Sequence, residues 1–353
     1  MKLLTINPGS TSTKIAVFND LDPELTINIK HTVDELSRFA RVSDQFEYRR
    51  DLVLNTLREN GIPLRFDAIV GRGGLLKPIE GGVYEVNDVM LSEMEHPMRN
   101  HASNLGCRLA ADIASRIPGC RALTADPGVV DELDDIARVS GSPLMPRVTT
   151  WHALNQRAIA RRHAAATGTR YEDLNLIIAH LGGGISIGAH RHGRCIDVNN
   201  AFDGEGPFSP ERAGSLPPGA LIDLCYSQKY TKEQLKRRIS GNAGLAAHLG
   251  TTDVAAIVES IDKGDKKAEL ILNSMIYQIA KNIGSAAVTL FGQIDAILLT
   301  GGVAYSDYVV SRIRSRVEFL APIFVYPGEN EMLALASNGL GALNGTIEIK
   351  EYK

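Results

Sequence analysis

The sequence is poor in several features that mark specialised classes of protein. Its 353 residues include only 4 cysteines and 1 tryptophan. Because Cys107, Cys120, Cys195 and Cys225 are far apart and form no CxxC pair, a disulfide framework or cysteine-based zinc site is disfavoured. No apolar run approaches the length of a membrane span, and the first one ends in Asn-Pro-Gly, unlike a signal peptide. We therefore expect a soluble, cytoplasmic protein.

An excess of charge of one sign is also absent. Lys and Arg number 38 against 41 Asp and Glu, which gives a formal net charge of −3. Basic residues are interspersed with acidic ones and form no long run, only short stretches such as Arg161-Arg162, so we expect no nucleic-acid partner. What the chain does have is length and 44% hydrophobic residues. Both are sufficient for two domains that each bury a core.

Two segments about half a chain apart predict the same strand–turn–strand unit. In the first segment, apolar strands over residues 3–6 and 15–18 flank a turn of small residues. In the second, strands over 176–179 and 185–189 flank three glycines, and a third strand follows over 195–198. This repetition predicts two duplicated domains with a cleft between them.

Helical periodicity appears between the predicted strands. Apolar residues recur every four positions from Leu105 to Ile117, and a second apolar stripe runs from Leu272 to Ile283. A buried strand over 296–299 follows the second stripe, and this alternation predicts α/β layers. Residues 201–219 contain too many Gly and Pro for regular structure, so they predict a long loop of the kind that usually serves function.

Turns of small residues follow three of the predicted strands. The NPGSTSTK turn lacks P-loop spacing and continues as a strand, yet its amides and hydroxyls could hold phosphate; a polar hairpin tip is the alternative. The HLGGG turn has three glycines, which are costly unless a ligand approaches closely, and its alternative is a tight hairpin. A third turn, Gly301-Gly302, could take a nucleotide base and ribose.

Two arginines are candidates for binding anions. Arg72 lies between glycines at the end of a strand, where packing explains it poorly, and a guanidinium can grip a carboxylate or phosphate through two hydrogen bonds. Arg212 lies in the long predicted loop. Its alternative is a solvated surface arginine, which is the commoner case.

Three further residues could serve chemistry or structure. Asp126, in the segment TADPG, could orient reacting groups or a metal-bound water, or could form an Asx turn or helix N-cap. His152 follows Trp151 at the start of a helical run, where it could be a packed histidine. Glu331 opens the last helical segment, where an acid in the first turn is favourable in any protein.

Together these segments resemble the acetate and butyrate kinase family, which belongs to the superfamily of actin, heat-shock chaperones and sugar kinases. The resemblance rests on INPGSTSTK, VGRGG, ADPG, TTWHALN, HLGGG, FSPERAG, LLTGGV and PGENEMLALA, and the length and the GRGGLLKPIEGGVYEVN stretch are closer to butyrate kinases. It implies an α/β fold of two duplicated actin-like (ribonuclease H-like) domains. Each would be a mixed sheet flanked by helices, with an interdomain active-site cleft. The implied domains are 1–148 and 149–330, with a C-terminal helix at about 331–353 packing back on the first.

The resemblance also implies roles for the candidate residues. Arg72 matches the arginine that holds the substrate carboxylate, and Asp126 matches the acid that organises the reacting groups. His152 and Arg212 match residues that stabilise the transferring phosphoryl group. His101 aligns with a substrate-side histidine, although the motif around it departs from the acetate kinase pattern.

Nucleotide and metal residues follow from the same resemblance. Glu331 matches an acid linked to magnesium, with Asn7 and Asp126 nearby. Acetate kinases carry Asn where this chain has Gly183. The residues implied to hold the nucleotide and its phosphates are Asn7, Ser10, Ser12, Lys14, His180, Gly182, Gly183, Gly184, Gly301 and Gly302.

The implied reaction is reversible, in-line transfer of the γ-phosphoryl group of ATP to butyrate, with Mg²⁺, giving butyryl phosphate and ADP. A carboxylate is already a nucleophile at neutral pH, so positioning and charge neutralisation suffice. Acetate, propionate and isobutyrate remain open as acceptors, because a hydrophobic pocket discriminates one methylene by only about 1–3 kcal/mol.

Two other classes also remain open: a non-enzymatic, nucleotide-driven interaction module like actin or the chaperones, and a metalloprotein that uses His190 and His192, although we read the segment HRH as a hairpin tip. The expected partners are a small carboxylate and a nucleotide, with no nucleic acid and no membrane. From the family resemblance we expect a homo-oligomer, a dimer or larger.

Overall fold

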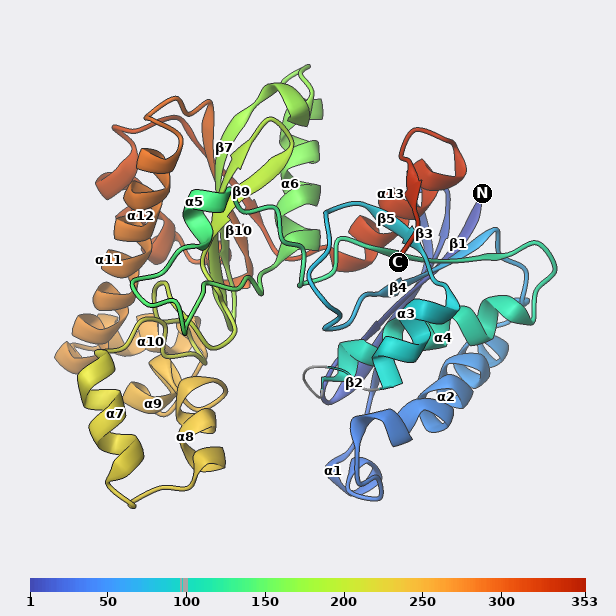
Figure 1. The fold of residues 1–353 in the computed structure, drawn as a ribbon, viewed down its shortest axis with the longest axis horizontal. Helices are drawn as coiled ribbons and strands as arrows, with labels where there is room; N and C mark the ends of the chain where they lie inside the picture. The colour runs from blue at the N-terminus through green and yellow to red at the C-terminus, as the bar shows by residue number, and fades with distance from the viewer. Residues whose placement is uncertain (96, 98–100) are drawn as a thin grey trace. The chain divides into compact units, whose positions relative to one another are not determined.

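The computed structural model describes residues 1–95, 97 and 101–353 and shows an α/β chain (Figure 1). The chain divides into two compact units. The first unit combines Met1–Val130 with Asn330–Lys353, and the second unit is Asp131–Glu329.

The second unit begins earlier than the expected boundary at 148/149. Its first residues are tied to its own sheet, since the Asp134 N–H donates to the Ile196 carbonyl at 2.9 Å. The Glu132 carboxylate also pairs with the buried Arg157 guanidinium at 3.0 Å. These contacts attach the residues from 131 onward to the second unit.

The first unit is built on a seven-stranded mixed sheet in the order β12-β5-β6-β4-β1-β2-β3. Strands β1, β2 and β3 pair antiparallel, whereas β1, β4 and β6 are parallel neighbours, so the carboxyl ends of these three strands lie at one edge. The strands are β1 (Lys2–Pro8), β2 (Ser12–Asn19), β3 (Asp22–Lys30), β4 (Ala68–Arg72), β5 (Val83–Glu85), β6 (Arg121–Ala125) and β12 (Ile349–Lys350).

Helices cover both faces of this sheet. Helices α2 and α4 pack on one face through an apolar core that includes Ile6, Val53 and Leu109. Helix α13 packs against β1, β4 and β6, and Gly339 allows this approach because a Cβ there would lie 2.6 Å from a methyl group of Val70. The helical segments of this unit are α1 (Val33–Leu36), η1 (Val42–Gln45), α2 (Phe46–Glu59), α3 (Asp88–Glu95), η2 (Ala102–Asn104), α4 (Leu105–Ser115) and α13 (Glu331–Leu343).

The second unit is built on a five-stranded mixed sheet in the order β11-β10-β7-β8-β9. Strands β7, β8 and β9 pair antiparallel, whereas β10 and β11 lie parallel to β7 and to each other. The same pattern occurs in β6-β4-β1-β2-β3 of the first unit, which confirms the predicted duplication. The strands are β7 (Asn175–Leu181), β8 (Ile185–Arg191), β9 (Arg194–Val198), β10 (Ala296–Gly301) and β11 (Ile323–Pro327).

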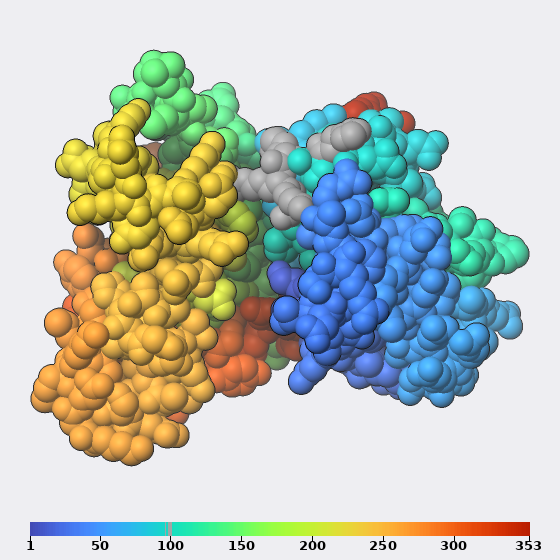
Figure 2. All heavy atoms as spheres, turned by 90° about the horizontal axis from the view of Figure 1, so that it is seen from below, coloured from blue at the N-terminus to red at the C-terminus, as the bar shows by residue number. Residues whose placement is uncertain are grey.

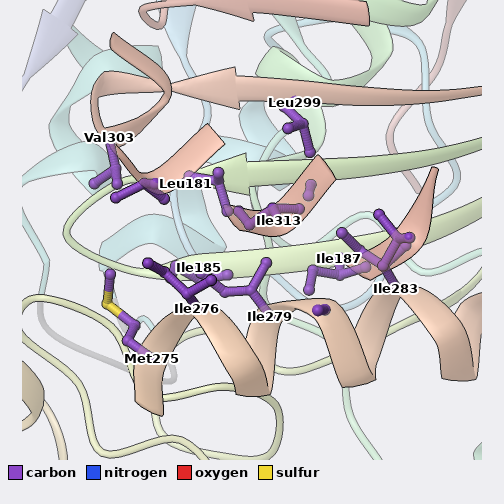
Figure 3. Close-up of a cluster of buried hydrophobic side chains, with 14 of the residues drawn as sticks. Leu181, Ile185, Ile187, Met275, Ile276, Ile279, Ile283, Leu299, Val303 and Ile313 are labelled. Carbon is purple, nitrogen blue, oxygen red and sulfur yellow. The ribbon is translucent and has the colours of Figure 1, made fainter. Parts of the chain in front are cut away.

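Helices flank this sheet too. Alternate residues of β7 point to opposite faces. Ile177 and Leu181 belong to the core that packs against α11, whereas Ile178 packs with α6. Figure 3 shows Leu181 in this core. Helices α7 and α8 (yellow in Figure 2) lie at the surface. The helical segments are α5 (Asp135–Arg138), α6 (Ala153–Ala166), η3 (Tyr171–Asp173), α7 (Pro218–Tyr226), α8 (Lys232–Ile239), α9 (Gly244–Leu249), α10 (Val254–Asp262), α11 (Lys266–Thr289), η4 (Gly302–Tyr305) and α12 (Asp307–Val317).

The predicted α/β architecture and its glycine-turn hairpins are therefore confirmed. The predicted loop over 201–219 is irregular through residue 217, and its end differs because α7 begins at Pro218, the first helical position that proline favours. The interdomain cleft stays a prediction. Among the described residues, no helix is long and apolar enough to cross a membrane.

Candidate active site

Three predicted residues meet at the carboxyl edge of the first unit's sheet. Asn7 is near the end of β1, Arg72 ends β4, and Glu331 opens α13. The Asn7 side-chain amide donates to Glu331 Oε2 at 2.5 Å, and the Arg72 guanidinium pairs with Glu331 Oε1. The Glu331 carboxylate therefore contacts two residues that lie 324 and 259 positions before it in the chain.

Two glycines explain how Arg72 is positioned. A Cβ on Gly71 would overlap the carbonyl of Gly106, and a Cβ on Gly106 would overlap the carbonyl of Arg72. Strand β4 and helix α4 are thus in direct backbone contact at this point. The strand end is closely packed, while the Arg72 side chain keeps 29% of its surface exposed and can reach a ligand.

Asp126 lies beside this group and is engaged by the backbone. It is 1% exposed and has a positive φ of 40°. Its Oδ1 accepts the Gly82 N–H at 2.8 Å, and its own N–H donates to the Gly82 carbonyl at 3.0 Å. The carboxylate therefore fixes the segment that enters β5, and Asp126 is not a helix N-cap. Its role toward a metal stays a prediction.

The oxygen atoms at this edge fit magnesium. Mg²⁺ keeps several waters and takes only one or two carboxylates together with substrate phosphates. The described residues contain no group of three or more His, Cys, Asp or Glu side chains that could hold a metal by themselves. The Glu331 carboxylate, 15% exposed and next to the Asn7 amide, is the kind of ligand that a largely hydrated ion needs.

The predicted phosphate hairpin joins β1 and β2. Its turn closes through a hydrogen bond from the Gly9 N–H to the Ser12 carbonyl at 2.8 Å. Ser10 and Lys14 are exposed, and Ser12 is partly exposed. These side chains are therefore accessible to an anion, as a phosphate turn requires.

Our sequence analysis missed Arg49, which supports this hairpin from inside. Its guanidinium, from α2, donates to the Gly9 and Ser12 carbonyls at 2.8 and 3.0 Å. Arg49 is fully buried, and this burial lowers its pKa to about 10. Arg49, Val53 and Leu57 recur every four residues and are all buried, so an arginine on the apolar stripe of a helix was the available signal.

His101 makes local contacts just before α4. Its Nδ1 accepts the Ser103 N–H at 3.2 Å and lies 2.8 Å from the Ser103 hydroxyl. A neutral His101 therefore carries its hydrogen on Nε2. His101 caps the turn whose helix packs on the end of β4, and its role toward substrate stays a prediction.

In the second unit, His152 and His180 are stacked. Their ring centroids are 3.8 Å apart and their planes differ by 10°. His152 precedes α6, and the nearly buried His180 lies one residue before the end of β7. The Nδ1 of His180 is 2.7 Å from Asn155 Oδ1, and its Nε2 is 3.5 Å from Glu329 Oε1. The structure thus brings together two predicted histidines whose spacing in sequence gave no sign of contact.

The three-glycine turn contacts the long loop. The Gly183 carbonyl accepts the Ser209 hydroxyl at 2.5 Å and the Glu211 N–H at 3.1 Å. A Cβ on Gly184 would overlap the guanidinium of Arg212. The third glycine is therefore required for Arg212 to reach the turn.

Arg212 is held with little solvent around it. Its guanidinium donates to the Ala201 carbonyl and lies 5.3 Å from the ring of Phe202. Burial lowers the pKa of Arg212, and the nearby carboxylates of Glu211 and Asp203 partly oppose this effect. A guanidinium in such surroundings interacts more strongly with an anion than one in water does.

A cavity of about 700 Å³ joins the remaining predicted turns. This volume lies in the range of small-molecule and cofactor sites. Gly301 packs against the backbone of Leu181 with φ of 89°, whereas a Cβ on Gly302 would have no neighbour within 4 Å. Residues lining the cavity include Gly182, Gly183, Glu211, Gly302, Tyr305 and Glu329.

The HRH segment divides into two parts. His192 and Gly193, with φ of 50° and 82°, form the β8–β9 turn, as expected of a hairpin tip. His190 instead lies fully buried in β8, bonded to Tyr171 and Gln156. The hairpin-tip prediction is therefore wrong for His190, because this residue lies within strand β8 and its side chain faces the core.

The chain is similar to known proteins over its whole length. Residues 147–330 match the family model described as the acetokinase family. The chain is 65% identical, over 100% of both chains, to a probable butyrate kinase of Bacteroides thetaiotaomicron. It is 50% identical to butyrate kinase 2 of Clostridium acetobutylicum, over 100% of this chain and 99% of that one.

Solved structures show the same fold. The acetate kinase of Porphyromonas gingivalis superposes with a TM-score of 0.78 at 18% identity, covering 97% of this chain and 99% of that one. A propionate kinase of Francisella tularensis gives 0.73 at 19% identity, covering 96% and 98%. These likenesses establish the predicted actin-like fold.

Proposed function

Because the chain belongs to the acetokinase family, we propose that it is a phosphotransferase that moves a phosphoryl group between ATP and a short-chain carboxylic acid, with butyrate as the preferred acid. The observation that carries the proposal is the match, over the whole chain, to relatives named butyrate kinases. Arg72 and Arg212 support it, since this reaction brings together several anions.

Arg72 is the proposed anchor for the acid. A guanidinium has five N–H donors in a planar fork, and Glu331 engages Nη1. The fork can also hold a carboxylate through two parallel hydrogen bonds, and each carboxylate oxygen keeps a second lone pair with which it can attack phosphorus. The carboxylate is ionised at neutral pH, so the site needs no general base.

Arg212 and His152 are the proposed stabilisers of the transferring phosphoryl group. The transition state spreads negative charge over three equatorial oxygens, so prearranged donors lower the barrier. The partly desolvated guanidinium of Arg212 is suited to this role. Removing one such arginine costs on the order of 10³–10⁵-fold in rate in other phosphoryl-transfer enzymes.

The nucleotide is proposed to lie in the cavity beside the Gly182–Gly184 and Gly301-Gly302 turns. The side chains of Asn7, Ser10, Ser12 and Lys14 would face its phosphates. Glu331, with Asn7 beside it, would hold magnesium, which would supply positive charge to neutralise the phosphates. Asp126 is proposed to support this edge through Gly82.

The proposed chemistry requires residues of both units at one phosphoryl group. Arg72 belongs to the first unit, whereas His152 and Arg212 belong to the second. Exclusion of water from the reacting phosphoryl group would suppress ATP hydrolysis. Assembly as a homo-oligomer, a dimer or larger, is part of the same proposal, and sedimentation of the purified protein tests it.

Trapping of the acyl phosphate tests the function. The protein is incubated with MgATP, hydroxylamine and acids from acetate to valerate, including propionate and isobutyrate, and the acyl hydroxamate is measured. We expect a maximum at butyrate. A maximum at another acid would keep the chemistry and change the substrate, whereas a folded, ATP-binding protein without acid-dependent product would be an interaction module.

A further inference from the structure

A chain of buried polar side chains leads from His152 into the core of the second unit. It runs through Ser186, Gln156 and His190 to Tyr171, and these four residues are 0–3% exposed. The successive side-chain distances are 2.9, 2.8, 2.8 and 2.6 Å. We call this set of four residues the Ser186 relay. The mechanism above uses His152 and leaves the relay without a role.

The direction of the hydrogen bonds is fixed by a backbone carbonyl. The Ser186 carbonyl can only accept, and it lies 3.0 Å from the Gln156 side-chain nitrogen. Gln156 Nε2 must therefore face Ser186, where its second hydrogen reaches Ser186 Oγ at 2.8 Å. The other atom of the same amide, Oε1, must then accept a hydrogen from His190.

His190 satisfies this requirement as a neutral ring. Burial and the nearby Arg157 cation lower its pKa to about 3. Its Nε2–H donates to Gln156 Oε1 at 2.8 Å, so its Nδ1 accepts the hydroxyl hydrogen of Tyr171 at 2.6 Å. Burial also raises the pKa of Tyr171, which keeps that hydroxyl protonated.

The contacts of the Ser186 hydroxyl also fix where its hydrogen points. A hydroxyl has two lone pairs and one hydrogen. Ser186 Oγ accepts from Gln156 Nε2 and, at 3.4 Å, from the His152 backbone N–H. Its own hydrogen is thus available for the His152 Nδ1 at 2.9 Å.

We propose that the Ser186 relay holds His152 in the tautomer with hydrogen on Nε2 and a lone pair on Nδ1. This inference deepens the proposed function, on which its catalytic meaning rests. An Nε2–H donor can stabilise an oxygen of the transferring phosphoryl group without a change of protonation. Ser186 and Gln156 are positioning residues in this scheme, because they act through His152.

The stacked neighbour, His180, carries a hydrogen on its Nδ1 atom. Asn155 donates its amide hydrogen to the Glu329 carbonyl at 3.0 Å, so Asn155 Oδ1 must accept from His180 Nδ1–H at 2.7 Å. His180 Nδ1 therefore carries a hydrogen, while its Nε2 faces the Glu329 carboxylate at 3.5 Å. Two parallel rings 3.8 Å apart would repel if both were cations, and a neutral His152 avoids this repulsion.

Nitrogen-15 NMR of histidine-labelled protein tests the tautomer directly. Long-range correlations between ring carbon-bound hydrogens and ring nitrogens show which nitrogen carries a hydrogen, and loss of a signal in His152→Gln assigns it among the 9 histidines. We expect a neutral His152 ring with hydrogen on Nε2 near pH 7. Hydrogen on Nδ1, or on both nitrogens, would overturn the proposal.

Kinetics of Ser186→Ala test its consequence. We expect kcat to fall about 10- to 100-fold, approaching the loss seen when one preorganised donor is removed, while KM for ATP and for the acid change less than about twofold. Ser186→Thr keeps a hydroxyl and should recover most of kcat. An unchanged kcat in a folded Ser186→Ala protein, or failure of Ser186→Thr to recover, would contradict the positioning role.

A matched control separates the relay from a general loss of serine hydroxyls. Ser274 is half-buried on α11 and donates to the Leu270 carbonyl of its own helix at 2.8 Å. Ser274→Ala should leave kcat unchanged, and an equal loss there would count against the relay. The tautomer of His152 is measured without substrates. If the wild-type protein had no kinase activity, the proposed function would be refuted, and the NMR result would still show whether the Ser186 relay sets the tautomer.

Discussion

Replacement of Arg49 by methionine tests whether a buried cation holds the β1–β2 hairpin. In the structure the guanidinium supplies hydrogen bonds to Gln45 Oε1 at 2.9 and 3.1 Å and to the Gly9 carbonyl at 2.8 Å. Methionine fills much of the same volume and donates none of these bonds. The variant therefore leaves acceptors without partners in the core of the first unit.

The magnitude follows from those acceptors. The Ser12 carbonyl keeps its bond from the Gly9 N–H, so the atoms left unpaired are chiefly Gln45 Oε1 and the Gly9 carbonyl. Each unsatisfied buried acceptor costs about 1–3 kcal/mol. Part of that cost is offset because a buried charge no longer has to be desolvated. We expect a net loss of about 3 kcal/mol.

Hydrogen exchange followed by mass spectrometry measures this loss locally. The single tryptophan, Trp151, belongs to the second unit and cannot report on the hairpin. A loss of 3 kcal/mol should speed exchange of the β1 and β2 amides about a hundredfold, since 1.4 kcal/mol corresponds to a factor of ten. Amides of β7 and β8 should be unaffected.

The neighbouring Arg50 provides the control. Its side chain is 19% exposed and pairs with Asp51 at 2.8 Å, and a surface pair of this kind contributes about 0–1 kcal/mol. Arg50→Met should change exchange of the hairpin less than about fivefold. If Arg49→Met and Arg50→Met gave the same exchange rates, the role assigned to Arg49 would be refuted.

Three further predictions concern backbone space and acid stability. Gly301→Ala should destabilise the fold by more than about 1 kcal/mol because its φ of 89° disfavours a side chain. In Gly302→Ala the added Cβ has no neighbour within 4 Å, so this variant should keep the melting temperature and raise KM for ATP. Equal melting temperatures of the two variants would contradict this prediction. Gly184→Ala should displace the Arg212 guanidinium and lower kcat at least about tenfold, as judged by hydroxamate formation, with wild-type turnover as the contrary result. Burial and Arg49 lower the pKa of His31 from 6.5 to about 4, so the unfolded state takes up the proton between these values. The free energy of unfolding should therefore decrease as the pH is lowered from about 6.5 to about 4, as measured by the midpoint of urea unfolding. If the midpoint decreased equally in His31→Gln, His31 would be excluded as the cause.

The repeated sheet could be predicted because its signals are local. Each hairpin combines two short apolar strands with a turn of small residues, and both turns occur where expected. Strand β3 was missed although Leu25, Ile27 and Ile29 alternate with polar residues. This alternation is the usual pattern of a half-exposed strand.

Contacts between distant residues could be predicted only in part. The meeting of Asn7 with Arg72 follows from the rule that parallel strands end at one edge, but the arrival of Glu331 depends on the packing of α13. Ser186 and Gln156 are polar residues in buried segments and 30 positions apart. No local pattern indicates which buried polar groups will satisfy one another.

The reverse reaction tests the central claim most directly. Purified protein is given butyryl phosphate and MgADP, and the phosphorus species are followed by ³¹P NMR, with Arg72→Ala as the comparison. We predict that ATP appears in step with loss of the acyl phosphate, and that Arg72→Ala slows this transfer by about 10³-fold or more. Consumption of butyryl phosphate with release of inorganic phosphate and no ATP, or wild-type turnover by Arg72→Ala, would contradict the account.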